Sequence, residues 1–471
     1  MRPNVHGIAL LTLALGVGCA TARSADPPGV ARDAGTSSVP SDEASTPTAS
    51  LDASTDVVAA RVQLDPDGND DDDAKPPESP SATLFEHATF TAVGKPPLGL
   101  TRICDLTAFG GKLYAAHANQ PLGSDGATIT AYRPDEAKTP FSVAFDWNRF
   151  GEPTKGGGGG QGFLRVHSID GRLFVPDADP PYGGLGAVDH GTEGYVFVSD
   201  KGGAFARARY PHAGLPGLPD TEGRAGASVL PRAYHVLDVV KFRGHYYAST
   251  GSVPPEARAW SGPSPGALHV AKPDLSRFTY ALGFPSPYPG GVWRLTYMTR
   301  FRDRLYAGIQ DYDGRSPFDY ALFTLPEGQD VLAESHAVGK RVTTLGAAYT
   351  LRWYADRGAL YWIAGTHDGA ISLRKTLDGD TWDTMDLPPT VGRPTDIVRY
   401  RGKLVVLAER GLVAMDDDGT HPRVLATITE KKSPFGFDDI LCAAPLGILG
   451  DNLYAGGQRG AVLYRLDPAT P

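Results

Sequence analysis

Charged residues recur at matching places along the sequence and have the types needed for acid–base chemistry or for holding a charged ligand. Four aspartates directly precede a Leu, Val or Ile, and three arginines occupy comparable places in other segments: Asp105, Asp238, Asp396 and Asp439, and Arg165, Arg294 and Arg352. Carboxylates in a pocket can exchange protons or bind a cation, and guanidinium groups suit planar anions. The same groups can instead pair with one another around ordered water, which is the interpretation we favour.

Histidines accompany these charges, at His167 and His235, and His117 follows another expected strand. No two histidines have the spacing that would place both on one face of a strand as metal ligands. We therefore expect structural histidines, no bound metal and no cofactor. His167 and His235 remain candidates for contact with a polar ligand.

A recurring turn indicates how these residues are positioned. The stretch Phe109–Tyr114 places a large apolar residue, a tight polar turn and an aromatic strand start in order, and six later stretches resemble it: 169–174, 242–247, 301–306, 356–361, 400–405 and 449–454. The residue after the turn recurs at intervals of 60, 73, 59, 55, 44 and 49 residues. A period near ~50 residues with four short strands is typical of β-propeller blades. The sequence therefore predicts an all-β, seven-bladed propeller over residues 84–471.

The two ends of this repeat region are expected to meet. The seventh unit has three strands, and the strand Leu84–Val93, ahead of the first unit, is the candidate for its missing outer strand. Pairing them would close the ring and remove its last open edge. Cys104 and Cys442 would then lie on neighbouring inner strands, so we expect a disulfide in an exported protein, with two separately buried thiols as the alternative.

Aromatic residues occupy or border the longest connections, which follow the second strands of units two to four. The ligand-binding candidates among them are Tyr182, Trp260, Trp293 and Tyr312. Such side chains stack on sugars or peptides. Beside Pro and Gly they equally pack loops onto the body, and both interpretations stay open.

The N-terminus has the features of an export signal, with Arg2 at the start, an apolar core from Ile8 to Val17, and Gly18-Cys19 behind it. It resembles a bacterial lipoprotein signal, which implies cleavage of residues 1–18 and a lipid on Cys19. An ordinary secretory signal is the alternative. Residues 19–83 are rich in Ala, Ser, Thr, Pro and Asp, and we expect a disordered tether. The resemblance implies anchoring in the bacterial envelope, at the outer membrane or the periplasmic face.

Charge separates the tether from the body. Residues 20–83 carry 13 acidic and 4 basic side chains, a net of −9 that equals the formal charge of the whole chain. Because Arg2 adds one positive charge, the body from residue 84 carries −1. A nearly neutral body argues against nucleic acid as a partner. The acidic run Asp65–Asp73 resembles the calcium loops of thrombospondin type 3 repeats, so calcium is a candidate ligand, although we favour a solvated spacer.

Short motifs resemble those of two propeller families. Gly111–Ala116 and Asn452–Gly457 look like kelch repeats, and Thr376–Trp382 is similar to the Asp-box turn of sialidase-type propellers, with a degenerate copy at Ser199–Phe205. In such a turn the carboxylate accepts backbone N–H groups and the aromatic residue anchors the next strand. These resemblances imply a fold and no activity.

The observations together predict an envelope-anchored propeller that binds a ligand or serves as a scaffold, with a polysaccharide or an envelope protein as partner. The alternative is a carbohydrate-active enzyme, a glycoside hydrolase or polysaccharide lyase, that uses the Asp and Arg residues at the propeller mouth. Two carboxylates roughly 5 to 10 Å apart in an open pocket would favour the enzyme. Aspartates paired to arginines in a filled channel would favour binding.

Overall fold

The structure, a computed structural model, describes the body of the chain and leaves gaps in its loops. The described residues are 87–118, 126–147, 162–177, 194–205, 207–210, 221–225, 227–230, 233–252, 266–271, 275, 278–283, 293–302, 304–311, 322–324, 340–343, 349–366, 369–436 and 441–468. All belong to one compact unit, Asp67–Pro471. The export signal, the tether and the run Asp65–Asp73 lie outside these ranges and stay predictions. Among the described residues, no helix is long and apolar enough to cross a bilayer.

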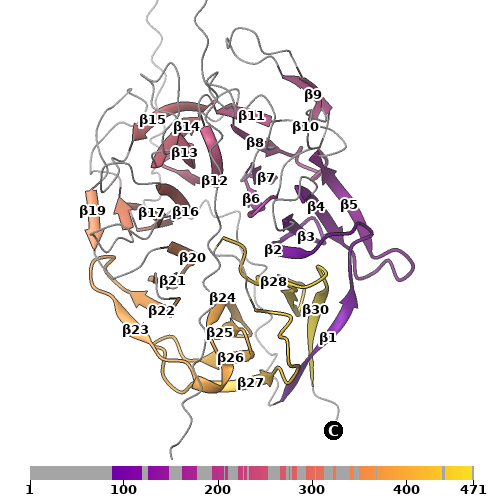
Figure 1. Cartoon of the computed structure of the whole chain (residues 1–471), viewed down its shortest axis with the longest axis vertical. Helices are drawn as coiled ribbons and strands as arrows, with labels where there is room; N and C mark the ends of the chain where they lie inside the picture. Colours follow the sequence, from indigo (N-terminus) through magenta and orange to yellow (C-terminus); the bar gives the residue numbers. More distant parts are fainter. Residues whose placement is uncertain are drawn as a thin grey trace, which may run out of the picture. The chain divides into compact units, whose positions relative to one another are not determined.

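Antiparallel four-stranded meanders follow one another along the chain, and each is a blade (Figure 1). The strands of blades one to four are β2 (Arg102–Phe109), β3 (Lys112–Ala118), β4 (Thr128–Tyr132) and β5 (Phe141–Asp146); β6 (His167–Ile169), β7 (Arg172–Pro176), β8 (Gly194–Val198) and β11 (Ala227–Leu230); β12 (Ala233–Phe242), β13 (His245–Ser252), β14 (Gly266–Ala271) and β15 (Phe278–Gly283); and β16 (Trp293–Phe301), β17 (Arg304–Asp311), β18 (Leu322–Thr324) and β19 (Lys340–Thr343). The strands of blades five to seven are β20 (Tyr349–Asp356), β21 (Ala359–Gly365), β22 (Ile371–Thr376) and β23 (Asp383–Met385); β24 (Pro394–Tyr400), β25 (Lys403–Ala408), β26 (Gly411–Met415) and β27 (Arg423–Thr427); and β28 (Leu446–Leu449), β29 (Asn452–Gly456), β30 (Leu463–Pro468) and β1 (Ala88–Gly94).

The blades form a closed ring in the described part of the chain. Blades four and five share one eight-stranded sheet, joined where Gln310 of β17 pairs with Tyr349 of β20. The first strands of successive blades contact one another from β2 through β28, and β28 contacts β2 again. Figure 1 shows these strands gathered around the centre. The predicted all-β propeller is confirmed.

The hydrophobic core lies between blades. In the described residues, seven clusters of buried side chains each join two neighbouring blades, and an eighth lies near the axis. Between blades one and two, for example, Phe145 stacks on Phe163 with ring centroids 5.7 Å apart and lies 4.9 Å from Phe197. A blade therefore buries its apolar faces only when its neighbours are present.

The recurring turn of the sequence connects the first and second strands of every blade. Its first residue has a left-handed backbone with φ between 48° and 57° in all seven: Gly110, Asp170, Arg243, Arg302, Arg357, Arg401 and Gly450. Where a glycine follows, its φ is also positive, as at Gly111 (72°) and Gly402 (78°). Two successive positive φ values define the type I′ turn, whose twist matches that of a hairpin.

The aromatic residue after the turn contacts the next blade and fixes the two blades relative to each other. The hydroxyl of Tyr361 in blade five donates a hydrogen bond of 3.1 Å to the carbonyl of Asp417 in blade six. Tyr306 of blade four lies so close to Gly379 of blade five that a side chain at Gly379 would overlap its hydroxyl. The repeated motif thus has a positioning role.

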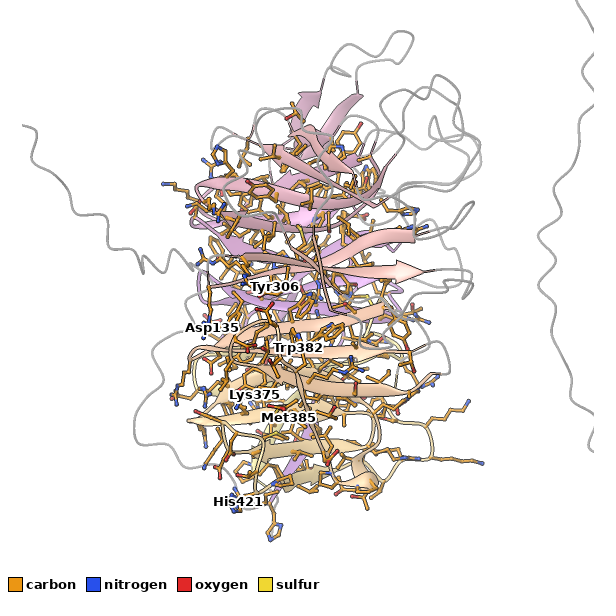
Figure 2. All side chains as sticks on the ribbon, turned by 90° about the vertical axis from the view of Figure 1, so that its left-hand side faces the viewer. Asp135, Tyr306, Lys375, Trp382, Met385 and His421 are labelled. Atoms are coloured by element: carbon orange, nitrogen blue, oxygen red, sulfur yellow. A yellow bond between two sulfur atoms is a disulfide. The ribbon has the colours of Figure 1, made fainter. Side chains whose placement is uncertain are left out.

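The turn at Asp378 has the hydrogen bonds expected from its sequence. Asp378 Oδ1 accepts the N–H groups of Asp380 at 2.8 Å and of Thr381 at 2.7 Å. These bonds hold the pKa of the Asp378 carboxyl well below its usual range. Trp382 packs edge-on against the buried Trp362, with ring centroids 5.4 Å apart. It lies near Tyr306 in Figure 2.

A strand pairing and a disulfide close the ring. The N-terminal strand β1 pairs antiparallel with β30, from Ala88 opposite Pro468 to Gly94 opposite Leu463, as the sequence predicted. A disulfide joins Cys104 of blade one to Cys442, just before the first strand of blade seven, with Cα atoms 4.7 Å apart. Both ends of the repeat region are therefore held at the outer and inner strands of the closing blades.

The outer strand of blade two differs from the sequence prediction. That prediction gave the position to residues 204–210, but β11 (Ala227–Leu230) pairs with β8 instead. Residues 207–210 form β9 (Arg207–Tyr210), which pairs with β10 (Thr221–Ala225) as a separate two-stranded sheet. The segment Ala-Ser-Val-Leu of β11 ends in the fully buried Leu230, whereas the β9 segment carries two arginines. The outer strand of this blade is the more apolar of the two candidates.

Removing the closing strand should abolish cooperative folding. Deletion of residues 84–93 leaves β30 with an open edge and removes the contact of Phe90 with Phe435, whose ring centroids are 4.7 Å apart. We expect a broad thermal transition at a lower temperature, measured by circular dichroism. A deletion of similar length within residues 24–80 is the control and should leave the transition unchanged. An unaltered transition in the first variant would contradict this closure.

Candidate functional site

Seven equivalent residues meet at the propeller axis. Each lies four residues before the last residue of the first strand of its blade, and we call the set the axial ring: Asp105, Arg165, Asp238, Tyr297, Arg352, Asp396 and Pro445. Five of the candidates predicted from the sequence are therefore brought to one level. Sequence reasoning missed Tyr297, which occupies the equivalent place in blade four, while Arg294 lies three residues earlier on β16.

A break in strand pairing turns these side chains inward. In blades one, three, five and six, the register skips one residue directly before the axial position, as between Ile103 and Asp105 or between Val236 and Asp238. A β-bulge of this kind bends a strand and redirects a side chain. The skipped residues Cys104 and Leu237 are buried near the axis. The bulge therefore places the axial charged residue and the apolar residue before it close to the axis together.

Arginines carry the contacts across the axis. Arg352 Nη1 lies 3.1 Å from Asp105 Oδ1, and Arg352 Nε lies 3.4 Å from Asp396 Oδ1. Arg352 Nη2 also donates to the carbonyl of Cys104 at 2.6 Å, so blade five is linked to blade one. Arg165 Nη1 lies 3.5 Å from Asp105 Oδ1. Two guanidinium groups thus share the Asp105 carboxylate.

Each described axial aspartate also holds the next blade by its backbone. Asp105 Oδ2 accepts the N–H of Val166 at 3.0 Å. Asp238 Oδ2 accepts the N–H of Met298 at 2.7 Å, and Asp396 Oδ2 accepts the N–H of Leu446 at 2.6 Å. In every case the donor lies one position beyond the axial residue of the following blade. For Asp105, Asp238 and Asp396, this contact explains why an aspartate recurs at the same place in the repeat.

Aromatic and apolar side chains fill the space around the ring. The guanidinium carbon of Arg165 lies 3.6 Å from the centroid of the Tyr297 ring, and the Tyr297 hydroxyl donates to the carbonyl of Leu441. Leu164 and Leu237 are buried in the same cluster as the Cys104–Cys442 disulfide. At this level the channel is occupied by the chain's own side chains.

The histidines divide into two environments. His117 is fully buried, and its Nδ1 donates to the carbonyl of Arg102 at 2.8 Å while its Nε2 lies 2.7 Å from the Thr130 hydroxyl. Burial lowers the pKa of His117 to about 4, so the ring is neutral at pH 7. His167 differs, since its Nε2 lies 2.6 Å from Asp238 Oδ1 and its side chain is 24% exposed. His235 is buried on β12, three residues before Asp238.

Burial dominates the electrostatics of the axial carboxylates. It raises the pKa of Asp105, although Arg165, His167 and the Val166 N–H oppose the shift. Burial also raises the pKa of Asp396 to about 7, against the N–H groups of Leu446 and Ile397, and the nearby charge of Asp105 adds to the rise. The ring therefore contains carboxyl groups that bind a proton more readily than they would in water.

Several of the other candidates are not among the described side chains. Asp439, Tyr182, Trp260 and Tyr312 lie outside the described residues, as does Cys19. Trp293 begins β16, and its side chain is also outside the description. In the part of the chain that the structure describes, no three His, Cys, Asp or Glu side chains are grouped as metal ligands. Binding by these residues stays a prediction.

Comparison with known proteins assigns the chain to no family. No protein-family model matches the chain, and no curated protein matches it. Similar solved structures include the extracellular domain of BT4673 from B. thetaiotaomicron (9% identity, TM-score 0.47, covering 82% of this chain and 41% of that one). Another is the WD40 domain of Neurospora crassa Pan2 (9% identity, TM-score 0.42, covering 79% of this chain and 90% of that one). A third is the gluconolactonase XC5397 of Xanthomonas campestris (12% identity, TM-score 0.38, covering 80% of this chain and 89% of that one). The chain spans less than half the length of the first. The strand pairing of the chain itself defines it as a β-propeller.

The axial carboxyls should make the protein more stable in mild acid. A carboxyl whose folded pKa is raised contributes stability that is full below its unfolded pKa of about 4 and is lost as pH rises through the folded value. For Asp396 this stability is lost between about pH 4 and about pH 7. We expect the free energy of unfolding in urea to fall between pH 5 and pH 8, by on the order of 2 kcal/mol for this group.

Two variants isolate that effect. Asp396→Asn removes the titrating group, so its unfolding free energy should depend less on pH over this range. Asp383→Asn changes an exposed carboxylate of β23 and should follow the wild-type curve. Parallel curves for Asp396→Asn and wild type would show that Asp396 does not titrate in the folded protein within this window.

Proposed function

We propose that this chain is a non-catalytic binding or scaffold propeller of the bacterial envelope. The observation that carries the proposal is the engagement of both carboxylate oxygens in each described axial aspartate. Asp105, Asp238 and Asp396 each use one oxygen for the N–H of the next blade and the other for an arginine, a histidine or a further backbone N–H. A general acid or base must instead present an oxygen to the substrate.

The filled axis supports the same proposal. The side chains of Arg165 and Arg352 are each 6% exposed, and those of Asp105 and Asp396 are 12% and 10% exposed. A substrate would have to displace ion pairs that hold neighbouring blades together. The ring therefore suits a structural role, and ligands are better sought on the two faces of the propeller, where connections lie.

Anchoring places the module in the envelope. In this proposal residues 1–18 direct export, a lipid on Cys19 retains the chain at the membrane, and the 64 residues from 20 to 83 span roughly 45 Å as a flexible coil. The tether carries most of the net negative charge and keeps the nearly neutral body away from the lipid surface. The ligand class we favour is polysaccharide, or else an envelope protein.

A carbohydrate-active enzyme is the second candidate. Its supporting observation is Arg352, which lies between two carboxylates on the axis, because Asp and Arg are residue types that glycoside hydrolases and lyases use. This candidate requires that Asp105 or Asp396 release its present partners when substrate binds. Product formation separates it from the binding module.

Anchoring is tested by changing the proposed lipid site. In a bacterial host that processes lipoproteins, we expect the wild-type chain in the membrane fraction with its mass increased by acyl chains. Cys19→Ser should move the chain to the soluble exported fraction with the same thermal transition. Recovery of both forms in the soluble exported fraction, with no acyl mass on the wild type, would refute lipid anchoring and favour an ordinary secretory signal.

Binding and catalysis are tested in one assay. The soluble Cys19→Ser chain is applied to a glycan array, and each bound glycan is then incubated with the protein and examined by mass spectrometry. We expect saturable binding with the glycan mass unchanged. Cleaved or unsaturated products that disappear in Asp105→Asn, with folding checked by circular dichroism, would favour the enzyme. The absence of binding to any glycan would leave the scaffold role with an envelope protein as partner.

A further inference from the structure

Arginine occupies a backbone position that disfavours it in four consecutive blades. Arg243, Arg302, Arg357 and Arg401 are the first turn residues of blades three to six, with φ between 48° and 54°. Such left-handed positions favour Gly, Asn or Asp, which cost less there than a long side chain. The equivalent residues of blades one, two and seven are Gly110, Asp170 and Gly450. A repeated departure from the local preference points to use of the side chain.

Three of these arginines are held flat by the residue before them. The guanidinium carbon of Arg243 lies 4.9 Å from the centroid of Phe242, that of Arg302 lies 5.6 Å from Phe301, and that of Arg401 lies 5.1 Å from Tyr400. Each aromatic ring is buried. Arg302 Nη2 also donates to the carbonyl of Leu377. Stacking on an aromatic face restricts a guanidinium and uses none of its N–H donors, and the planar donor edge suits planar anions such as carboxylate and phosphate.

The four arginines follow one face of the propeller. Each axial aspartate contacts the residue one position further along in the next blade, so neighbouring first strands run in the same direction. Their turns therefore lie on a common face. The turns between third and fourth strands share this face, as Figure 2 shows for Asp135 and His421, on the same side of the body. Arg243, Arg302 and Arg357 are exposed and Arg401 is half-buried. We call the four residues the arginine arc.

Several acidic residues on this face pair with cations that are not part of the arc. Asp380 pairs with Arg304 at 2.9 Å, and Asp416 pairs with Lys403 at 2.5 Å. Asp417 pairs with Arg399 at 2.8 Å and lies more distantly, at 3.7 Å, from the arc residue Arg357.

Asp378 and Asp418 accept N–H groups of their own turns. The arc itself places four guanidinium groups on the corresponding turns of successive blades.

We propose that the arginine arc binds a linear polysaccharide that carries repeated carboxylate or phosphate groups. This inference rests on the proposed binding function and names the face and the ligand class. One small anion needs several donors converging at one point, whereas arginines on four consecutive turns match charges that repeat along a chain. The guanidinium groups supply bidentate hydrogen bonds to each anionic group, and the stacking keeps them positioned before the ligand arrives.

The backbone of the arc allows a variant that keeps the fold. Glycine adopts positive φ without steric cost, so Arg243→Gly, Arg302→Gly and Arg401→Gly together should leave the thermal transition unchanged or raise it. The charge-matched control is Lys95→Gln, Lys431→Gln and Lys432→Gln. These exposed lysines lie in connections from an outer strand to the next first strand, on the opposite face.

The test measures binding of the soluble Cys19→Ser chain to polygalacturonate, a polymer of carboxylated sugars, with dextran as the neutral comparison. We expect wild type and the lysine control to bind polygalacturonate and not dextran. The arginine variant should bind about tenfold more weakly. The dependence of log Kd on log salt concentration should also become shallower, because fewer ions are released.

Other results would overturn the inference. Equal weakening by both triple variants would indicate diffuse charge attraction with no role for the arc. Binding that the arginine variant retains would exclude the arc while leaving the proposed binding function intact. Association with vesicles of phosphatidylglycerol, in place of polygalacturonate, would identify the arc as a membrane-docking face. Failure on every glycan of the array would count against carbohydrate binding as well as the arc.

Discussion

The contact between one blade and the next is the constraint on which the whole molecule depends. A four-stranded sheet this short buries little on its own, and the clusters of buried side chains lie between blades. The axial aspartates reinforce this contact because each accepts a backbone N–H from the following blade. A carboxylate is well suited here, since it accepts several hydrogen bonds and donates none when ionised.

The charges on the axis follow from the number of blades. Ions brought this close and removed from water must be paired, and like charges must be kept apart. Seven positions in a ring cannot alternate strictly between two signs. In the order of the blades the axial residues are Asp, Arg, Asp, Tyr, Arg, Asp and Pro, so Pro445 separates the like charges of Asp396 and Asp105, while Tyr297 lies between Asp238 and Arg352, which have opposite signs. Tyr297 also offers its ring to Arg165 at 3.6 Å, which offsets part of the cost of burying that cation.

Repetition made most of the fold predictable from the sequence. The turn at Phe109 and its six relatives gave the blades, and the three-stranded last unit indicated closure by an N-terminal strand, which β1 confirms. The outer strand of blade two could not be predicted, because an inserted hairpin, β9 and β10, precedes it. For the site, the recurrence of charged residues at comparable places in the repeats indicated Asp105 and Arg352, but only exact counting back from the strand end identifies Tyr297. The pairing of Arg352 across the ring depends on closure and is invisible in any single repeat.

The two faces of the propeller are built under different constraints. Tight turns with a left-handed first residue form the face that carries the arginine arc, and they have little conformational freedom because each connects adjacent strands directly. A side chain at such a turn is held in place by the rigid hairpin below it, and an aromatic partner fixes it further. Longer connections on the other face can vary without disturbing strand pairing. Arginine at a left-handed position therefore reduces the stability of the turn, but its side chain is already oriented before a ligand binds. A side chain on a flexible loop would have to be ordered when the ligand binds.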